Sequence, residues 1–328
     1  MDNLKNCPTL LMPIFLTEQN VEQLLTMNDA LRLVEDAFRE LGNGAAQNQP
    51  RQRIRAPHGV LNVMPAGIFT RGYMGFKAYT SFRGGARFYF HLFDGNSGEY
   101  LAIIEADRLG QMRTGAASGV ATKFLARQDS KTIGIIGTGW QAESQLQAVC
   151  AVREFGSVKC FSRDETRRKQ FAEKMSAQLN IAIEPVASTR DAIVESDVVI
   201  AITTAAQPVV MGEWLRAGAH INAAGGNWAA RREVDSAAVK RAHAIFADSV
   251  EQAKIEAGDL ILAVSENAIG WEKVQEMSAL VSGRAVGRAS EDDITLFKSC
   301  GIALEDVAVG TFVYERAREM KIGTELKI

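Results

Sequence analysis

A short glycine-containing segment carries the clearest chemical signal in the sequence. Residues 137–142 read Gly-Thr-Gly-Trp-Gln-Ala, directly after the apolar run 133–136 and at the start of a helical pattern that extends to about Phe155. In such a strand–turn–helix, the first glycine permits a tight turn, the second lets the backbone approach a pyrophosphate, and the small sixth residue keeps the helix close to the strand. Free N–H groups at the helix N-terminus favour the negative charge. An ordinary strand-to-helix turn is the alternative. The segment predicts a dinucleotide site with contacts from Gly137, Thr138, Gly139, Trp140 and Gln141.

The end of the next apolar run indicates which dinucleotide is bound. A carboxylate at this position accepts hydrogen bonds from the ribose hydroxyls and repels a 2′-phosphate. Here the run ends in Ser162-Arg163-Asp164, and Arg167 follows one helical turn later. A guanidinium can bind a phosphate through two hydrogen bonds. Ser162, Arg163 and Arg167 are therefore predicted cofactor contacts, and NADP(H) is the favoured cofactor. NAD(H) stays open, because Asp164 could bind the ribose hydroxyls and the arginines could simply form a solvated helix face.

The elements that must position this motif alternate between strands and helices from Lys131 onward, which is typical of a parallel sheet wrapped by helices. The predicted strands are TIGIIG, SVKCFS, IAIEPV, DVVIAI, HINAAG and AIFADS. The fold class is therefore α/β, with a Rossmann doubly wound parallel sheet and a smaller α+β region before it.

The first 125 residues predict that smaller region. Residues 51–104 form short runs interrupted by glycines, as in an antiparallel sheet. A helix is expected over 26–41, with Thr26 or Asn28 as the N-cap and Gly42 or Gly44 at its end. Further helices are expected over 114–126 and 294–319.

Composition limits the function classes. The 328 residues are 47% hydrophobic and 23% charged, with a formal net charge of −2, so no basic surface points to nucleic acid or lipid. The four cysteines form no CxxC pair and the four histidines are dispersed, so no metal site is expected. Pro13 interrupts the apolar patch 10–16, and no run approaches the length of a membrane span. We expect a cytoplasmic protein.

Further blocks of the chain resemble the ornithine cyclodeaminase/mu-crystallin family, which also contains archaeal-type alanine dehydrogenases and ketimine or Δ1-pyrroline-2-carboxylate reductases. The blocks are PRQRIRA, LNVMPA, MGFKAYTSF, LAIIEADRLGQMRTGAASGVATKFLAR, IGIIGTGWQAESQ, INAAGGN with RREVD, and ITLFKSCGIALEDVAVG. They span nearly the whole chain. The resemblance implies a homodimer in which residues 1–125 and 311–328 bind substrate and form the dimer, and 126–310 bind NAD(P).

The same resemblance implies the substrate site. Arg53, Lys77 and Arg113 match positions that hold the substrate carboxylate and the group beside it, and Met64 matches a pocket-lining position. Cations converging on a small acid supply charge-assisted hydrogen bonds that position it for hydride transfer. Singly, each cation is more typical of an ordinary surface or structural role.

The remaining predicted cofactor contacts lie in the family blocks or after strands whose carboxyl ends face a dinucleotide. They are Thr114, Thr203, Thr204, Asn222, Ala223, Gly225, Ser299 and Gly301. Asp306 belongs to the last block and is expected either to cap a helix or to anchor one domain to the other.

One departure from the family pattern bears on the reaction. Where cyclodeaminases and alanine dehydrogenases of the family carry an aspartate, this chain has Asn227. An amide forms hydrogen bonds but is no general base at neutral pH. With Lys77 and Asn227 as catalytic residues, we favour an NAD(P)H-dependent reductase of a small cyclic 2-imino acid. The alternatives are ornithine cyclodeamination, an amino-acid dehydrogenase acting on alanine or an analogue, and, least favoured, a non-catalytic binding protein.

Overall fold

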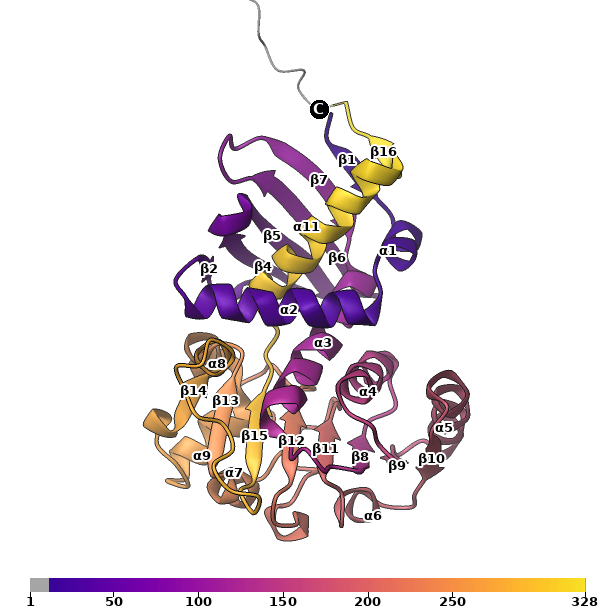
Figure 1. Ribbon diagram of the computed structural model, residues 1–328, viewed down its shortest axis with the longest axis vertical. Coiled ribbons are helices and arrows are strands. Elements are labelled where there is room, and N and C mark those ends of the chain that lie inside the picture. Colours follow the sequence, from indigo (N-terminus) through magenta and orange to yellow (C-terminus); the bar gives the residue numbers. More distant parts are fainter. Residues whose placement is uncertain (1–11, 328) are drawn as a thin grey trace, which may run out of the picture.

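The computed structural model describes residues 12–327, which form two lobes that each contain an eight-stranded sheet (Figure 1). Sheet A has the order β16-β1-β7-β6-β5-β4-β2, with β3 paired to β4. The bounds of its strands are β1 Ile14–Leu16, β2 Ala46–Asn48, β3 Gln52–Ala56, β4 Gly59–Ile68, β5 Tyr73–Phe82, β6 Gly85–Asp94, β7 Tyr100–Glu105 and β16 Thr324–Glu325. The prediction of an antiparallel sheet over 51–104 is confirmed, and only β1 joins it in parallel, alongside β7.

Sheet B is parallel throughout, with the order β10-β9-β8-β11-β12-β15-β13-β14. Its strands are β8 Thr132–Ile136, β9 Ser157–Phe161, β10 Ala182–Pro185, β11 Val198–Ala201, β12 His220–Ala223, β13 Ala244–Ala247, β14 Val274–Glu276 and β15 Thr295–Lys298. All six predicted strands are present. The chain reverses its direction of travel across the sheet between β8 and β11, which is where α/β sheets of this kind bind ligands.

The expectation of helix over 294–319 was wrong for its first residues. Residues 295–298 form β15, which lies between β12 and β13, and helix α11 (Ala303–Met320) follows. All four residues of β15 are fully buried, so sheet pairing on both sides overrides any local helical tendency. The predicted domain boundary between residues 310 and 311 falls within α11.

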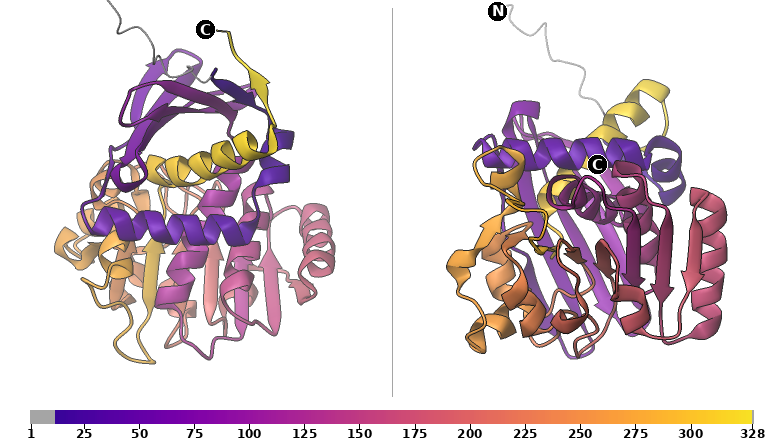
Figure 2. Two further views of the ribbon diagram at one scale, coloured as in Figure 1. Left: turned by 45° about the horizontal axis from the view of Figure 1, so that its top comes forward. Right: turned by 60° about the horizontal axis from the view of Figure 1, so that its bottom comes forward.

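Helices α2 and α11 give sheet A its core. Helix α2 (Met27–Gly42) begins at the N-cap Thr26, which forms a capping box with Asp29, and the left-handed Gly44 (φ 75°) follows its end. Helix α11 crosses the inner face of sheet A, and α2 lies between α11 and the lower lobe (Figure 2). The remaining helices are α1 Glu18–Leu24, α3 Asp107–Leu125, α4 Trp140–Val152, α5 Glu165–Leu179, α6 Thr189–Ile193, α7 Ser236–Arg241, α8 Val250–Glu256, α9 Gly258–Ser265 and α10 Met277–Val281.

Helix α3 connects the two lobes and begins seven residues earlier than expected. Its small residues allow other elements to approach closely: a Cβ atom added at Gly115 would lie 2.4 Å from the carbonyl oxygen of Ser144 in α4, and one at Gly119 would lie 2.5 Å from Leu31 of α2. This packing places Arg113, on the same helix, between the sheets.

None of the helices within residues 12–327 combines the length and apolarity needed to cross a membrane. Cys7 and the first two residues of the apolar patch 10–16 lie outside the described residues, and residues 14–16 form β1.

Candidate active site

Two cavities meet at the carboxyl ends of β8 and β11. The glycine-loop cavity, of about 710 Å³, is bordered by residues 137–139, 161–164 and 202–209. The cleft cavity, of about 290 Å³, lies between sheet A and the loops of sheet B. Ile202 lines both, so a molecule that extends from one cavity into the other passes this side chain.

The glycine loop has the geometry that a pyrophosphate needs. Gly137 has φ 104°, and a Cβ atom there would lie 2.2 Å from the carbonyl oxygen of Ile202, so only glycine fits. Gly139 is the N-cap of α4, and a Cβ atom at this position would meet no protein atom within 4 Å. The space over the helix N-terminus is therefore open, which fits an anion held by backbone N–H groups.

The end of β9 forms the far wall of the glycine-loop cavity. The Thr138 hydroxyl donates to Ser162 Oγ at 2.7 Å, which joins the glycine loop to this strand end. The Asp164 carboxylate caps α5 by accepting the Arg167 N–H at 3.0 Å, and it also pairs with Arg167 Nε at 3.4 Å. Arg163 is exposed on the cavity wall. The Asp164 carboxylate, which would favour NAD(H) by binding the ribose hydroxyls, is thus already hydrogen-bonded to the first turn of α5.

The cleft cavity brings together most of the predicted substrate and nicotinamide contacts. Among the residues that line it are Arg53, Lys77, Arg113, Thr114, Gln141, Gly225, Asn227, Ser299 and Gly301. They come from β3, β5, α3, α4, the loop after β12 and the loop after β15. Segments far apart in the sequence therefore meet at one point, as the sequence analysis expected.

A buried carboxylate orients two of the predicted substrate cations. Asp306 of α11 accepts from Lys77 Nζ at 2.8–2.9 Å and from Arg113 Nε at 3.1 Å, and Arg113 also donates to Glu305 at 2.8 Å. Burial and the nearby Arg113 lower the pKa of Lys77 to about 8, although Asp306 opposes this. Asp306 is not the N-cap of α11, which is Ile302, and its contacts join α11 to β5 and α3.

A second carboxylate, which the sequence analysis did not identify, organises two arginines. Glu256 of α8 pairs with Arg51 and Arg53, each at 2.5 Å, and all three side chains are largely buried. Arg51 also donates to the carbonyl oxygens of Cys300 and Gly301 at 2.9 and 3.0 Å. The alternation of arginines in PRQRIRA was a signal for Arg51, since alternate residues of a strand share one face.

The loop after β12 reaches across the cleft. Arg53 donates to the backbone carbonyl oxygen of Asn227 at 3.1 Å. The Trp228 ring lies 5.1 Å from the Arg53 guanidinium and 5.2 Å from that of Arg55, within cation–π range. Trp228 also lines the cleft cavity, although the sequence analysis gave it no role.

Asp248 fixes the loop that carries Ser299 and Gly301. This fully buried carboxylate accepts N–H bonds from Cys300 and Gly301 at 2.7 and 2.6 Å and a hydroxyl bond from Ser299 at 3.2 Å. Gly301 adopts φ 74°, and a Cβ atom there would lie 2.6 Å from an Arg113 nitrogen. No sequence signal marked Asp248, which follows an ordinary buried strand.

Several predicted contacts do not line either cavity. The Asn222 side chain is fully buried and donates to Thr122 at 2.9 Å, beside His220, and Ala223 is buried within β12. Met64 lies beneath the site with its sulfur 3.2 Å from Arg51 Nε. The Trp140 side chain is half exposed outside both linings. The predicted Thr203 and Thr204 do line the glycine-loop cavity.

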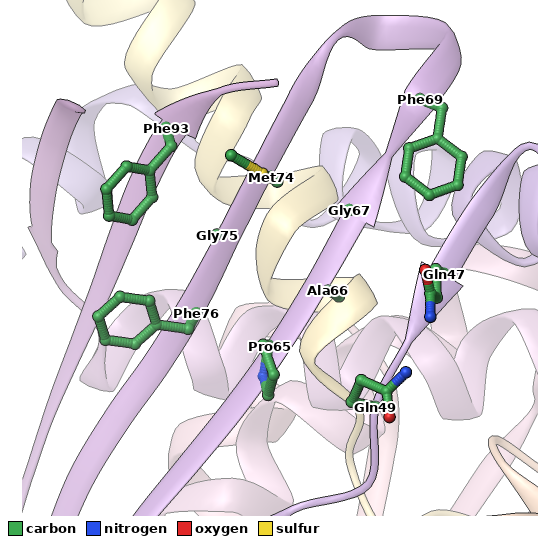
Figure 3. A pocket seen from close by; sticks show the side chains of 10 residues that line it. All are labelled: Gln47, Gln49, Pro65, Ala66, Gly67, Phe69, Met74, Gly75, Phe76 and Phe93. Carbon is green, nitrogen blue, oxygen red and sulfur yellow. The ribbon is translucent and has the colours of Figure 1, made fainter. Parts of the chain in front are cut away.

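A third hollow, of about 430 Å³, lies on the face of sheet A that α11 does not cover. Pro65, Met74, Phe76 and Phe93 line it from the neighbouring strands β4, β5 and β6, and Phe69 lines it from the turn after β4 (Figure 3). Phe69 and Met74 are 59% and 42% exposed. This apolar surface shares no lining residue with the two cavities of the site.

Comparison with known proteins identifies the family. A model of the ornithine cyclodeaminase/mu-crystallin family matches residues 12–321. The chain belongs to this family. No three His, Cys, Asp or Glu side chains within residues 12–327 come together as a ligand set for a metal ion.

Members of the ornithine cyclodeaminase/mu-crystallin family with different activities are similar to this chain. A Δ1-pyrroline-2-carboxylate reductase of Bacillus cereus is 38% identical over 237 residues, which is 72% of this chain and 73% of the relative. The structure of the Thermococcus litoralis Δ1-pyrroline-2-carboxylate reductase with NADH and L-proline has a TM-score of 0.91 and 37% identity, covering 95% of this chain and all of that one. An archaeal alanine dehydrogenase dimer with bound NAD has a TM-score of 0.92 and 35% identity, covering 97% and 100%.

Proposed function

We propose that this protein is an NAD(P)H-dependent reductase of a small cyclic 2-imino acid, such as the conversion of Δ1-pyrroline-2-carboxylate to L-proline. The observation that carries the proposal is the convergence of Arg53, Lys77 and Arg113 on a cavity that adjoins the glycine-loop cavity at Ile202. Relatives with this reaction, and one relative holding NADH and L-proline, support it. Arg53, Lys77 and Arg113 bind the carboxylate and orient the C=N carbon.

The protein's own side chains supply orientation and charge. When bound, the reduced nicotinamide supplies one hydride to the C=N carbon, and the nitrogen carries the proton that completes the amine. Lys77 remains mostly protonated at neutral pH because its pKa is about 8, so its charge can hold the substrate carboxylate. The loops at residues 224–228 and 299–301 form walls of the cleft cavity beside this point.

Asn227 favours reduction over cyclodeamination. Cyclodeamination needs amine groups to be deprotonated and ammonia to leave, for which a carboxylate at this position is suited and an amide is not. Reduction of a preformed iminium needs only orientation. The Asn227→Asp variant tests this reading: gain of ammonia release from ornithine would support it, and an unchanged reaction profile would refute it.

We propose NADP(H) as the preferred cofactor and NAD(H) as the second. The support is the exposed Arg163 on the cavity wall and the use of Asp164 as the cap of α5. The NAD(H)-binding relatives favour the second cofactor. An Arg163→Gln variant should lower the NADPH-to-NADH ratio of kcat/KM about tenfold, because one phosphate partner is lost. The control is Arg190→Gln, which changes an exposed arginine elsewhere in the same lobe.

The first experiment measures initial rates of NADPH and NADH oxidation with Δ1-pyrroline-2-carboxylate and its six-membered homologue. Turnover with either imine supports the proposal, and the absence of turnover with both refutes it. The second candidate is an alanine-type dehydrogenase, which the archaeal relative favours. Oxidation of NADH with pyruvate and ammonia, but not with the imines, would select that candidate.

We also propose a homodimer in which the apolar outer face of sheet A is the interface, with residues 1–125 and 311–328 as the substrate and dimerisation part and 126–310 as the cofactor part. The exposed apolar side chains at 69 and 74 and the dimeric state of the archaeal relative support this. Met74→Glu should convert a dimer into a monomer in light scattering, because a charge would be buried there. A wild-type monomer at micromolar concentration would refute the proposal.

A further inference from the structure

The buried Glu233 side chain links a loop of the glycine-loop cavity to a loop of the cleft cavity. It lies on the segment between β12 and α7 and is 1% exposed. One carboxylate oxygen accepts the backbone N–H of Thr203 at 2.5 Å, and the other accepts that of Gly225 at 2.7 Å. Thr203 lines the glycine-loop cavity and Gly225 lines the cleft cavity. One side chain therefore sets the distance between the loops that follow β11 and β12.

The position of this carboxylate is fixed by its own backbone. The Glu233 N–H donates to the buried Asp259 at 2.6 Å, and its carbonyl oxygen accepts from Val209 and Val210 at 2.7 and 2.9 Å. At the other end, a Cβ atom on Gly225 would lie 2.3 Å from the Thr203 nitrogen and 2.5 Å from Glu233 Oε1. The loops approach so closely that the residue at 225 has no space for a side chain, and small movements of Glu233 are transmitted to both loops.

A buried lysine completes the arrangement. Lys298 of β15 donates to the Gly226 carbonyl oxygen at 2.7 Å and pairs with Asp259 at 2.8 Å. The charged groups that face Glu233 are thus Asp259 from α9 and Lys298 from β15. None of these side chains lines either cavity, so their role is to hold the loops rather than to touch a ligand.

We propose that Glu233 is a positioning residue that couples the cofactor and substrate cavities, and that loss of its negative charge weakens dinucleotide binding. Both oxygens of the ionised carboxylate accept an N–H group. A protonated carboxyl would direct its O–H against one of these two donors, so one hydrogen bond would be lost and one loop released. The inference rests on the proposed dinucleotide binding but not on the identity of the substrate.

The charge state of this group changes in an accessible pH range. Burial and, secondarily, Asp259 raise the pKa of Glu233 to about 7, whereas Lys298 and the Thr203 N–H oppose this. Dinucleotide affinity should therefore fall as the pH is lowered through about 7. NADH is the suitable probe, because the 2′-phosphate of NADPH is a monoester that itself titrates near pH 6.

The test measures NADH binding to the full chain, without substrate, from pH 6 to pH 8.5. For the wild type, we expect the Kd to rise as the pH is lowered through about 7 and to level off about tenfold above its value at pH 8.5, because the protonated carboxyl loses one hydrogen bond. Glu233→Gln should bind NADH about tenfold more weakly at pH 8, because its amide NH₂ faces one of the backbone donors, and its Kd should be flat below pH 8. Glu233→Gln with wild-type affinity and pH dependence would overturn the proposal.

A matched control is available in the same lobe. Burial also raises the pKa of Glu276 to about 7, and this residue accepts a backbone N–H from Val250, but it lies on the edge strand β14 and lines neither cavity. Glu276→Gln should keep the wild-type binding curve. If it removed the pH dependence as well, the assignment to Glu233 would be overturned.

A second variant covers the case in which Glu233→Gln does not fold. Glu233→Asp keeps the charge but withdraws it by one methylene, so NADH binding should weaken at pH 8 while a pH-dependent step remains. Binding indistinguishable from wild type would overturn the proposal. Because no substrate is present, a protein that binds NADH as described but reduces no imine would refute the proposed function and leave this inference standing.

Discussion

Replacing Asp306 by asparagine should reveal how the site keeps a lysine charged in a dry environment. Lys77 and Asp306 are 2% and 0% exposed, and their charged atoms are 2.8 Å apart. Breaking a buried ion pair by removing one partner costs about 3–5 kcal/mol. Without Asp306, Lys77 loses its main favourable contact and should be mostly neutral at pH 7. We therefore expect Asp306→Asn to lower the free energy of unfolding by about 3 kcal/mol at that pH.

The pH dependence of this loss identifies its cause. In the unfolded chain a lysine stays protonated to about pH 10, so a lysine whose pKa is lowered in the folded state makes stability increase with pH. Between pH 7 and 9, wild-type Lys77 releases its proton around pH 8, whereas in Asp306→Asn it is already neutral. Integration over this range gives the variant about 1.4 kcal/mol more stabilisation than the wild type. The difference between the two proteins should thus shrink from about 3 to about 1.6 kcal/mol.

The assay is urea denaturation of both proteins at pH 7, 8 and 9. Lys77→Met provides the control background, in which Asp306→Asn should have the same effect at all three pH values. A stability difference between wild type and Asp306→Asn that stays constant from pH 7 to pH 9 would refute the reasoning, as would an Asp306→Asn variant as stable as the wild type at pH 7.

Three further outcomes follow from the site. Gly139→Ala should leave the melting temperature unchanged, because its Cβ meets open space, but it should weaken NADH binding tenfold or more. Gly137→Ala should instead lower the free energy of unfolding by about 1–3 kcal/mol, because residue 137 has a positive φ and its Cβ would clash with the Ile202 carbonyl oxygen. In steady-state kinetics with the imino acid, KM should increase above pH 8 as Lys77 loses its charge, and a flat profile to pH 9.5 would remove Lys77 from carboxylate binding. Trp228→Leu should raise the same KM about fivefold through loss of its contact with Arg53, with little change in NADH affinity; unchanged kinetics would leave that contact without a role.

The parts of the fold that could be predicted are those in which local pattern and environment agree. Six of the eight strands of sheet B are apolar runs with turn residues between them, and the Thr26 cap precedes a regular amphipathic helix. Strand β15 was missed because its four residues, Thr-Leu-Phe-Lys, contain only two apolar side chains next to a helix and are too short to show a distinctive period. Its position between β12 and β13 is decided by long-range packing.

The site shows the same division. The glycine loop was readable from spacing, since its backbone chemistry requires glycine at fixed intervals, and the three cations came from the family blocks. Three buried carboxylates of the site were not readable: Glu256, which pairs with Arg53, and Asp248 and Glu233, which hold the loops that carry Gly301 and Gly225. Their burial and their partners are set by chain segments up to about two hundred residues away, as in the pair of Arg51 with Glu256. A single sequence contains no local record of such contacts.

The late position of β15 in the chain has a consequence for synthesis. This strand fills the gap between β12 and β13, and the α11 that follows it supplies Asp306 and covers sheet A. On the ribosome, the chain up to residue 294 must therefore emerge while sheet B still has two unpaired interior edges and sheet A lacks its covering helix. Such edges are templates for intermolecular pairing. The nascent chain should thus depend on chaperones or rapid completion, and truncation before residue 295 should give aggregates rather than a shortened, folded protein.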